Sequence, residues 1–163
     1  MTSVWRGNYL EMHDDDGWEY VGRVGGMSAV AIEAIIDGDI LLVEQYRAPL
    51  KQRCIEFPAG LIGDDDGGED DTPEAAAIRE LEEETGYRAG RIEYVGRYFS
   101  SPGMVSESFH LVRAHDLEKV GAGGGTASED ILVHRVPLGD VRRFVQEKRD
   151  DGIAIDVRLM QFA

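Results

Sequence analysis

The chain has 163 residues, of which 42% are hydrophobic, and this length fits one compact domain with its own core. Its 32 acidic and 17 basic residues give a formal net charge of −15, which repels a phosphate backbone and argues against nucleic-acid binding. No apolar run reaches the roughly 18 residues of a membrane span, the N-terminus lacks a signal-peptide core, and the single cysteine, Cys54, has no disulfide partner. We therefore expect a cytoplasmic protein that binds neither nucleic acid nor membranes.

The N-terminal half consists of short apolar segments separated by turn residues, which is typical of strands. The first two, within residues 1–25, are predicted to pair around the turn 14–17. Asp37-Gly38 stands between two apolar, β-branched runs and predicts a tight hairpin. The predicted strands of this half are 4–11, 18–24, 29–36, 40–46 and 54–57.

The clearest helix follows at residues 72–85. Thr72 can cap its first turn, Pro73 suits the first helical position, and Gly86 suits the residue that ends it. Apolar side chains three or four residues apart predict the face that packs on the core. They are Ile78, Leu81 and Thr85.

The remaining segments mix strands, loops and amphipathic stretches. The acidic stretch 63–71 and the glycine-rich stretch 121–128 are predicted loops, and the acidic runs resemble adaptation to high salt. Irregular mixing of strands and helices favours an α/β sandwich in a single domain, 1–163, over regular βαβ units. The further predicted elements are strands 92–99, 108–114 and 131–136, an amphipathic helix 137–148 and a short terminal helix 153–162.

Three carboxylates lie close together on the predicted helix 72–85. Glu80, Glu83 and Glu84 are three or four residues apart, so they project from one face. Like charges at this spacing repel, at a cost of roughly a few tenths of a kcal/mol per pair. A hard divalent cation would compensate for this repulsion. The alternative is a solvated acidic face on an acidic protein.

The residues around these carboxylates favour the metal site. The string 79–87, Arg-Glu-Leu-Glu-Glu-Glu-Thr-Gly-Tyr, resembles the end of the Nudix hydrolase signature, with Tyr87 where the family has an aliphatic residue. The helix start at 72–76 is also similar. An acidic insertion lengthens the box, 58–87, so that Asp71, or else Glu69, replaces the Glu that partners the box arginine.

This resemblance implies a Nudix-type α/β/α sandwich with a mixed central sheet. It also implies Mg²⁺-dependent attack of water on phosphorus, with Mn²⁺ as a possible substitute. Glu80 and Glu84 would bind the metal, Glu83 would support them and take part in catalysis, and the Ala59 carbonyl would complete the site. Arg79 lies one turn before Glu83, so we expect an ion pair between them that orients the cluster.

Segments outside the box resemble ADP-ribose pyrophosphatases. They are 44–47, 56–60 and 100–107, and Pro102 stands sixteen residues after Gly86, as in that subfamily. The resemblance implies that Arg47 contacts phosphate or ribose, that Glu56 contacts the sugar or a metal-linked water, and that Glu107 lies beside the distal ribose. Pro102 and Gly103 would border the substrate.

The segment 128–131 resembles the loop that carries the catalytic base in that subfamily, which makes Glu129 the candidate base. Glu107 is the next choice, and both could be ordinary surface acids. The N-terminal strands commonly build a homodimer in this subfamily, so the resemblance implies one here.

The predicted reaction is hydrolysis of ADP-ribose to AMP and ribose 5-phosphate. The box equally permits another nucleotide sugar or a dinucleotide, such as ADP-glucose or NADH. A non-catalytic nucleotide sensor usually has a degraded box or an attached effector domain, whereas Glu80, Glu83 and Glu84 are all present here.

Overall fold

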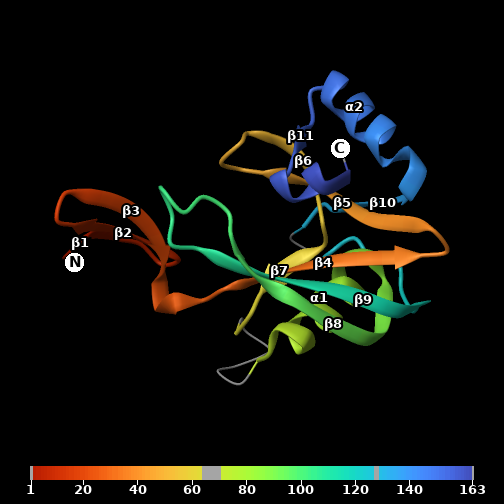
Figure 1. Cartoon of the computed structure of the whole chain (residues 1–163), viewed down its shortest axis with the longest axis horizontal. Helices are drawn as coiled ribbons and strands as arrows, with labels where there is room; N and C mark the ends of the chain where they lie inside the picture. Colours follow the sequence, from red (N-terminus) through yellow and green to blue (C-terminus); the bar gives the residue numbers. More distant parts are fainter. Residues whose placement is uncertain (1, 64–70, 127–128, 163) are drawn as a thin grey trace.

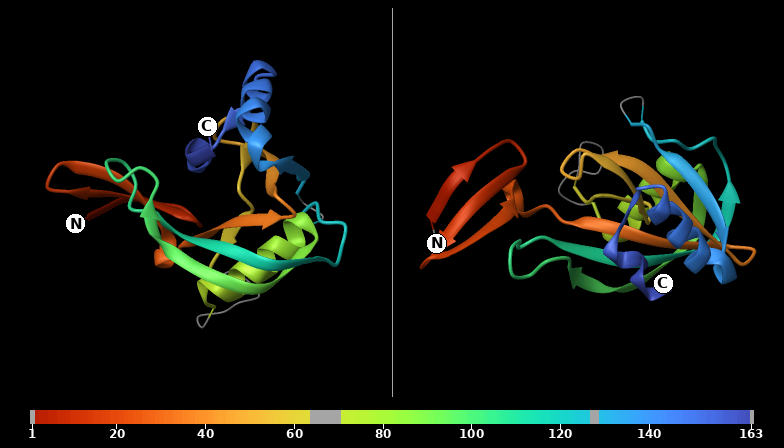
Figure 2. Two further views of the ribbon diagram at one scale, coloured as in Figure 1. Left: turned by 45° about the vertical axis from the view of Figure 1, so that its right-hand side comes forward. Right: turned by 90° about the horizontal axis from the view of Figure 1, so that it is seen from above.

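The computed structural model describes residues 2–63, 71–126 and 129–162. Its N-terminal part is a small antiparallel sheet of β1 (Thr2–Arg6), β2 (Leu10–Asp15) and β3 (Trp18–Arg23), which projects from the main body (Figures 1 and 2). The predicted antiparallel pair around the turn 14–17 is confirmed as β2 and β3. The predicted strand 4–11 is divided into β1 and β2, which adds a third strand to this sheet. A turn between Gly7 and Leu10, with a backbone hydrogen bond of 2.8 Å, separates β1 from β2.

The main sheet combines parallel and antiparallel strands, as predicted. Its central hairpin turns at Asp37 and Gly38, whose φ angles of 54° and 86° suit the tight turn expected from the sequence. β4 pairs in parallel with β9, and β6 with β11, while the other named pairs are antiparallel. The strands are β4 (Ala29–Ile36), β5 (Asp39–Arg47), β6 (Gln52–Glu56), β7 (Ala59–Leu61), β8 (Tyr87–Phe99), β9 (Ser108–Lys119), β10 (Leu132–Pro137) and β11 (Ala154–Ile155).

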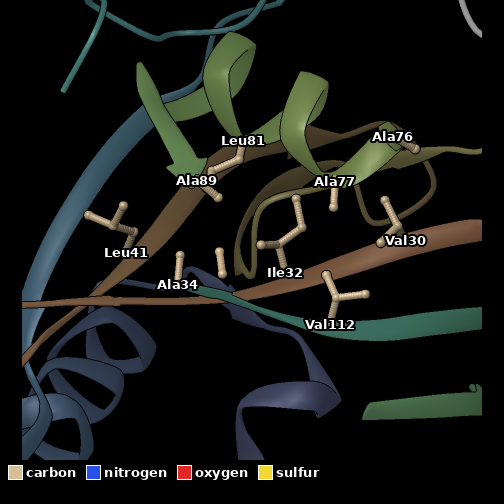
Figure 3. Packing of buried hydrophobic residues seen from close by; sticks show 10 residues of the cluster. Val30, Ile32, Ala34, Leu41, Ala76, Ala77, Leu81, Ala89 and Val112 are labelled. Carbon is tan, nitrogen blue, oxygen red and sulfur yellow. The ribbon is translucent and has the colours of Figure 1, made fainter. Parts of the chain in front are cut away.

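Helix α1 (Pro73–Thr85) covers one face of the sheet (Figure 1). Thr72 accepts a hydrogen bond from the Ala75 amide at 3.2 Å, and Gly86 ends the helix with a φ of 73°, as predicted. Figure 3 shows Ala76, Ala77 and Leu81 against the strands. Ile78 is only half-buried, so the predicted core face is rotated. Alanines at the contact let the helix backbone approach the sheet closely.

Helix α2 (Val141–Asp150) and the C-terminal segment cover the opposite face. Leu41 of β5 packs toward α1, whereas its neighbours Ile40 and Leu42 pack toward α2, as the two-residue period of a strand requires. This confirms the predicted α/β/α sandwich. Short 3₁₀ helices lie at Val24–Gly26, Leu138–Asp140 and Val157–Phe162. Among the described residues, no helix is long and apolar enough to cross a membrane.

The predicted terminal helix 153–162 is only partly confirmed, because Val157–Phe162 is a 3₁₀ helix but the residues before it are not helical. Ala154 and Ile155 instead pair with Cys54 and Ile55 of β6. The Asp156 side chain then accepts a hydrogen bond from the Arg158 amide at 2.8 Å, which turns the chain into the final 3₁₀ helix. Pairing of the apolar residues 154 and 155 with the sheet edge therefore overrides the helical pattern at the start of the segment.

Candidate active site

A cavity of about 680 Å³ lies between the sheet, the amino end of β7, α1 and the C-terminal segment. We call it the central cavity. Side chains that the sequence places far apart meet in its wall. The predicted site residues that line it are Arg47, Glu56, Ala59, Glu80, Glu84, Glu107 and Glu129.

One side of the central cavity, the carboxylate wall, consists of Glu80, Glu84 and Glu129. Glu84 is only 4% exposed and accepts a hydrogen bond from the Ala59 amide at 2.9 Å. Burial, reinforced by the carboxylates of Glu80 and Glu129, raises the pKa of Glu84 to about 8 although the Ala59 amide opposes the shift. Burial likewise raises the pKa of Glu80 to about 7, against the opposing effect of Arg79. This wall carries more negative charge than its surroundings neutralise.

Gly60 makes room for one of these carboxylates. A Cβ atom on Gly60 would lie 1.9 Å from Cδ of Glu80, far inside contact distance. A residue with a side chain at position 60 would displace the Glu80 carboxylate. Glycine at this position of the box is therefore needed for Glu80 to pack against β7.

Arg79 holds the start of α1 against the preceding loop. It donates from Nη1 to Asp71 Oδ2 and from Nη2 to the Leu61 carbonyl, both at 3.1 Å, and its Nη2 lies 3.5 Å from Glu80 Oε1. The predicted Arg79–Glu83 pair is thus replaced by Asp71 and Glu80. Asp71, with a side chain only 2% exposed, is the arginine's partner that the lengthened box was expected to provide. The alternative partner, Glu69, lies outside the described residues.

Glu83 is exposed on α1 and does not belong to the described lining of the central cavity. Its backbone carbonyl accepts a hydrogen bond from Gly125 at 3.0 Å. The helix therefore contacts the loop that leads to Glu129 through its backbone, and the supporting role of the Glu83 carboxylate stays a prediction.

The other side of the cavity, the ion-pair wall, consists of Arg47, Glu56, Asp156 and Arg158. Arg47 donates from Nε and Nη2 to the two oxygens of Glu56, both at 2.7 Å. Arg158 donates from Nε and Nη2 to the two oxygens of Asp156, at 2.7 and 2.8 Å. Asp156 and Arg158 are not among the site residues predicted from the sequence, because their only signal is an Asp-x-Arg spacing after a short apolar run.

The loop between β8 and β9 brings Glu107 to the central cavity. Arg23 of β3 donates from Nε to Glu107 at 2.6 Å, and backbone hydrogen bonds of 2.9 and 3.0 Å join Val21 to Ser106 and Met104. Pro102 and Gly103 belong to the same loop but are exposed and lie outside the described lining.

The comparisons with known proteins agree with this geometry. Residues 26–153 match the model of the NUDIX domain, which is more than half of the chain. The chain belongs to the Nudix hydrolase family. As a Nudix hydrolase it acts on diphosphate bonds.

Individual relatives also match most of the chain. The Nudix chain is 36% identical over 146 residues to a methanol dehydrogenase activator of Bacillus methanolicus, covering 88% of this chain and 75% of that protein. It is 35% identical over 122 residues to an ADP-ribose pyrophosphatase of Bacillus subtilis, covering 74% of this chain and 63% of that protein, which is less than two thirds of its length. A solved structure described as an ADP compounds hydrolase superposes with a TM-score of 0.68 at 25% identity, covering 89% of this chain and 80% of that one.

Nudix hydrolases in general need a divalent metal, and the carboxylate wall fits one. The carboxylate oxygens of buried Glu84 and half-buried Glu80 are hard ligands, and burial together with neighbouring carboxylates raises the pKa values of both groups. Within residues 2–63, 71–126 and 129–162, no three His, Cys, Asp or Glu side chains converge on one point. Mg²⁺ does not require such a cage, because waters and substrate phosphates complete a shell begun by one or two carboxylates.

Cys54 is buried as predicted, with 4% of its surface exposed. Burial, together with the nearby Glu56, raises the pKa of its thiol to about 12. A thiol that stays protonated is a poor nucleophile, although it borders the cavity.

Proposed function

We propose that this Nudix hydrolase converts ADP-ribose and water into AMP and ribose 5-phosphate with Mg²⁺ as its cofactor and Mn²⁺ as a substitute. The observation that carries the proposal is the central cavity, where the undercompensated Glu80 and Glu84 face the guanidinium of Arg47. A diphosphate with a metal ion complements both sides. The likeness to the ADP-ribose pyrophosphatase of Bacillus subtilis supports the choice of substrate.

The carboxylate wall holds the reacting part of the substrate. Glu80 and Glu84 would bind Mg²⁺, with the Ala59 carbonyl as a further ligand and Glu83 in support. When bound, Mg²⁺ neutralises the diphosphate and lowers the pKa of the attacking water. Arg47, oriented by its two hydrogen bonds to Glu56, donates to a phosphate or ribose oxygen.

Glu129 is proposed to accept the proton of the attacking water. Its Oε2 accepts hydrogen bonds from the Thr126 amide at 2.8 Å and from the Thr126 hydroxyl at 3.1 Å, so it borders the cavity while tied to its own loop. The oxygen of the water forms a bond to phosphorus as the bond from that phosphorus to the bridging oxygen breaks. The proton passes to Glu129, and the two monophosphates leave.

We further propose that the N-terminal sheet forms a homodimer interface. It exposes Trp5 at 58%, Tyr9 at 70% and Trp18 at 64%, and aromatic side chains are enriched at protein–protein interfaces. Sedimentation velocity tests this proposal. A species of 36 kDa, twice the 18.0 kDa of one chain, is expected, and a monomer at micromolar concentration would contradict it.

The first experiment measures AMP release from ADP-ribose by the purified protein, with and without millimolar Mg²⁺, at low and at high salt. Metal-dependent AMP formation is expected. ADP-glucose and NADH serve as comparison substrates, and a strong preference for either would replace ADP-ribose as the substrate. If the protein binds ADP-ribose but hydrolyses it in none of these conditions, the result would favour a non-catalytic nucleotide sensor.

A further inference from the structure

The ion-pair wall is a chain of fixed, alternating charges. Arg158 Nη2 lies 3.5 Å from Glu56 Oε2, so Glu56 stands between the guanidinium groups of Arg47 and Arg158. The Arg158 side chain is only 18% exposed, and its guanidinium lies 5.3 Å from the centre of the Phe109 ring. Two hydrogen bonds to Asp156 and the ring beside it hold the Arg158 guanidinium in one orientation before any ligand binds.

This arrangement leaves donors available to a ligand. Arg47 and Arg158 each use Nε and Nη2 for their carboxylate. For each, Nη1 has no hydrogen-bond partner among residues 2–63, 71–126 and 129–162. The carboxylates of Glu56 and Asp156 retain lone pairs as acceptors. The wall therefore offers alternating donors and acceptors.

The formal charges of the ion-pair wall cancel, since two arginines face two carboxylates. A phosphate group in addition to the diphosphate would bind weakly here, because Glu56 and Asp156 already compensate the positive charge of the two arginines. A neutral ring with neighbouring hydroxyl groups suits this wall better, because each hydroxyl can donate to a carboxylate and accept from a guanidinium.

The position of the pair in the chain adds an independent observation. Asp156 and Arg158 lie beyond residues 26–153, the stretch that matches the Nudix family model. They reach the cavity because β11 pairs with β6 and places residue 156 beside the end of that strand, where the Asp156 amide donates to the Ile55 carbonyl at 3.0 Å. Substrate preference can differ between family members at such a position without altering the shared metal-binding machinery.

We propose that Arg158, fixed by Asp156, is a specificity-determining residue that donates from Nη1 to a hydroxyl of the neutral sugar on the far side of the diphosphate. The inference rests on the proposed nucleoside diphosphate sugar substrate. Arg158, from the C-terminal segment, would line the sugar subsite together with Arg47 and Glu56.

Calorimetric titration with ADP-ribose and with ADP, which lacks the second sugar and ends in a terminal phosphate instead, tests this contact. The titrations are made in a chelator, so that neither metal nor turnover enters the measurement. The wild-type chain should bind ADP-ribose more tightly than ADP. Arg158→Gln should weaken ADP-ribose binding about 10-fold, which corresponds to about 1.4 kcal/mol, and leave ADP binding within about 2-fold.

Two further variants separate this contact from effects on charge or folding. Arg158→Lys keeps the charge but lacks the Nη1 donor, so it should lose the preference for ADP-ribose as Arg158→Gln does. Arg143→Gln removes an arginine whose side chain is 69% exposed on α2, and it should leave both affinities unchanged. Thermal unfolding verifies that each variant is folded.

An equal loss of ADP-ribose and ADP binding in folded Arg158→Gln would overturn the inference, as would full preference in Arg158→Lys. Equal binding of the two ligands by the wild-type chain would overturn it as well. Because binding is measured without turnover, absence of AMP release in the hydrolysis assay would count against the proposed function alone.

Discussion

The two sides of the central cavity differ in how far their carboxylates are neutralised by basic side chains. On the carboxylate wall, burial and the charges of neighbouring carboxylates raise the pKa values of Glu80 and Glu84 to about 7 and about 8. On the ion-pair wall, Glu56 is equally buried, yet Arg47 contacts both of its oxygens at 2.7 Å. Each wall contains at least two carboxylates, but only in the ion-pair wall does each carboxylate form hydrogen bonds with an arginine.

This difference indicates what each wall binds. Undercompensated buried carboxylates are stabilised by a cation that comes from outside, whereas carboxylates already paired with arginine gain little from one. A buried acid is therefore a candidate metal ligand when its protein partners leave the charge unneutralised. Burial alone does not distinguish the two walls.

The largest expected effect comes from removing charge on the carboxylate wall. Glu84→Gln should lower kcat for ADP-ribose by about 10³-fold or more, because metal-assisted charge stabilisation carries most of the catalysis in this chemistry. Steady-state kinetics in Mg²⁺ measures it. The matched control is Glu82→Gln on the same helix, where Glu82 pairs with Arg88 at 2.8 Å and activity should stay within about 2-fold. Near-normal activity of Glu84→Gln would contradict the assignment of this wall to the metal.

A smaller effect is expected for the third member of the carboxylate wall. Glu129→Gln should lower kcat about 100-fold and flatten the acidic limb of the pH–rate profile, since a general base typically contributes 10²–10⁴-fold. Glu107→Gln is the matched comparison, because Glu107 also lines the cavity but is paired with Arg23 at 2.6 Å. A larger loss in Glu107→Gln than in Glu129→Gln would exchange the two roles.

Gly60→Ala tests the geometry of the same wall without changing any charge. The new Cβ would displace the Glu80 carboxylate, which is the flexible end of its side chain, so the fold should persist while activity falls about 10-fold and the Mg²⁺ requirement rises. Titration of activity with Mg²⁺ measures both. Gly139→Ala is the control, since a Cβ there meets nothing within 4 Å. An unchanged Mg²⁺ requirement would mean that Glu80 is not a ligand.

The smallest effect is a dependence of stability on pH in the absence of metal. The pKa of Glu84 rises from its ordinary 4.5 to about 8 on folding, so the folded chain binds the proton more tightly than the unfolded chain. The contribution of this group is therefore favourable at low pH and is lost as pH rises from about 4.5 to about 8. The melting temperature of the metal-free protein should fall by a few degrees per pH unit over this window.

Glu84→Gln isolates this contribution, because glutamine does not titrate. Its melting temperature should depend less on pH than that of the wild-type chain, and added Mg²⁺ should stabilise the wild-type chain more than the variant at pH 8. Parallel pH curves for the two proteins would contradict the raised pKa of Glu84.

Local chemistry made much of the fold predictable. The limits of α1 follow from Thr72, Pro73 and Gly86, whose effects depend on the residues within one helical turn. The hairpin at Asp37-Gly38 is local in the same sense. The predictions failed where pairing with a segment distant in the sequence determines the secondary structure. The segment 153–162 has a helical pattern, but pairing with β6 makes part of it a strand.

The candidate site shows the same division. Glu80, Glu83 and Glu84 are placed on one helix by their spacing, and the family was recognisable from that string alone. Which of these acids is buried depends on the sheet beneath the helix, so that Glu84 is enclosed and Glu83 is exposed. The partner of Arg79 was likewise left open until the loop before α1 placed Asp71 at 3.1 Å.

By itself, the sequence determined the helix that carries the carboxylates, the hairpin and the family, because these depend on neighbouring residues and a contiguous motif. Only the tertiary structure decided that Arg158, paired with Asp156, contacts Glu56, which lies about a hundred residues earlier in the chain. Contacts at that separation are set by strand pairing and by the shape of the cavity. Such long-range contacts produce no periodic pattern in the sequence from which they could be predicted.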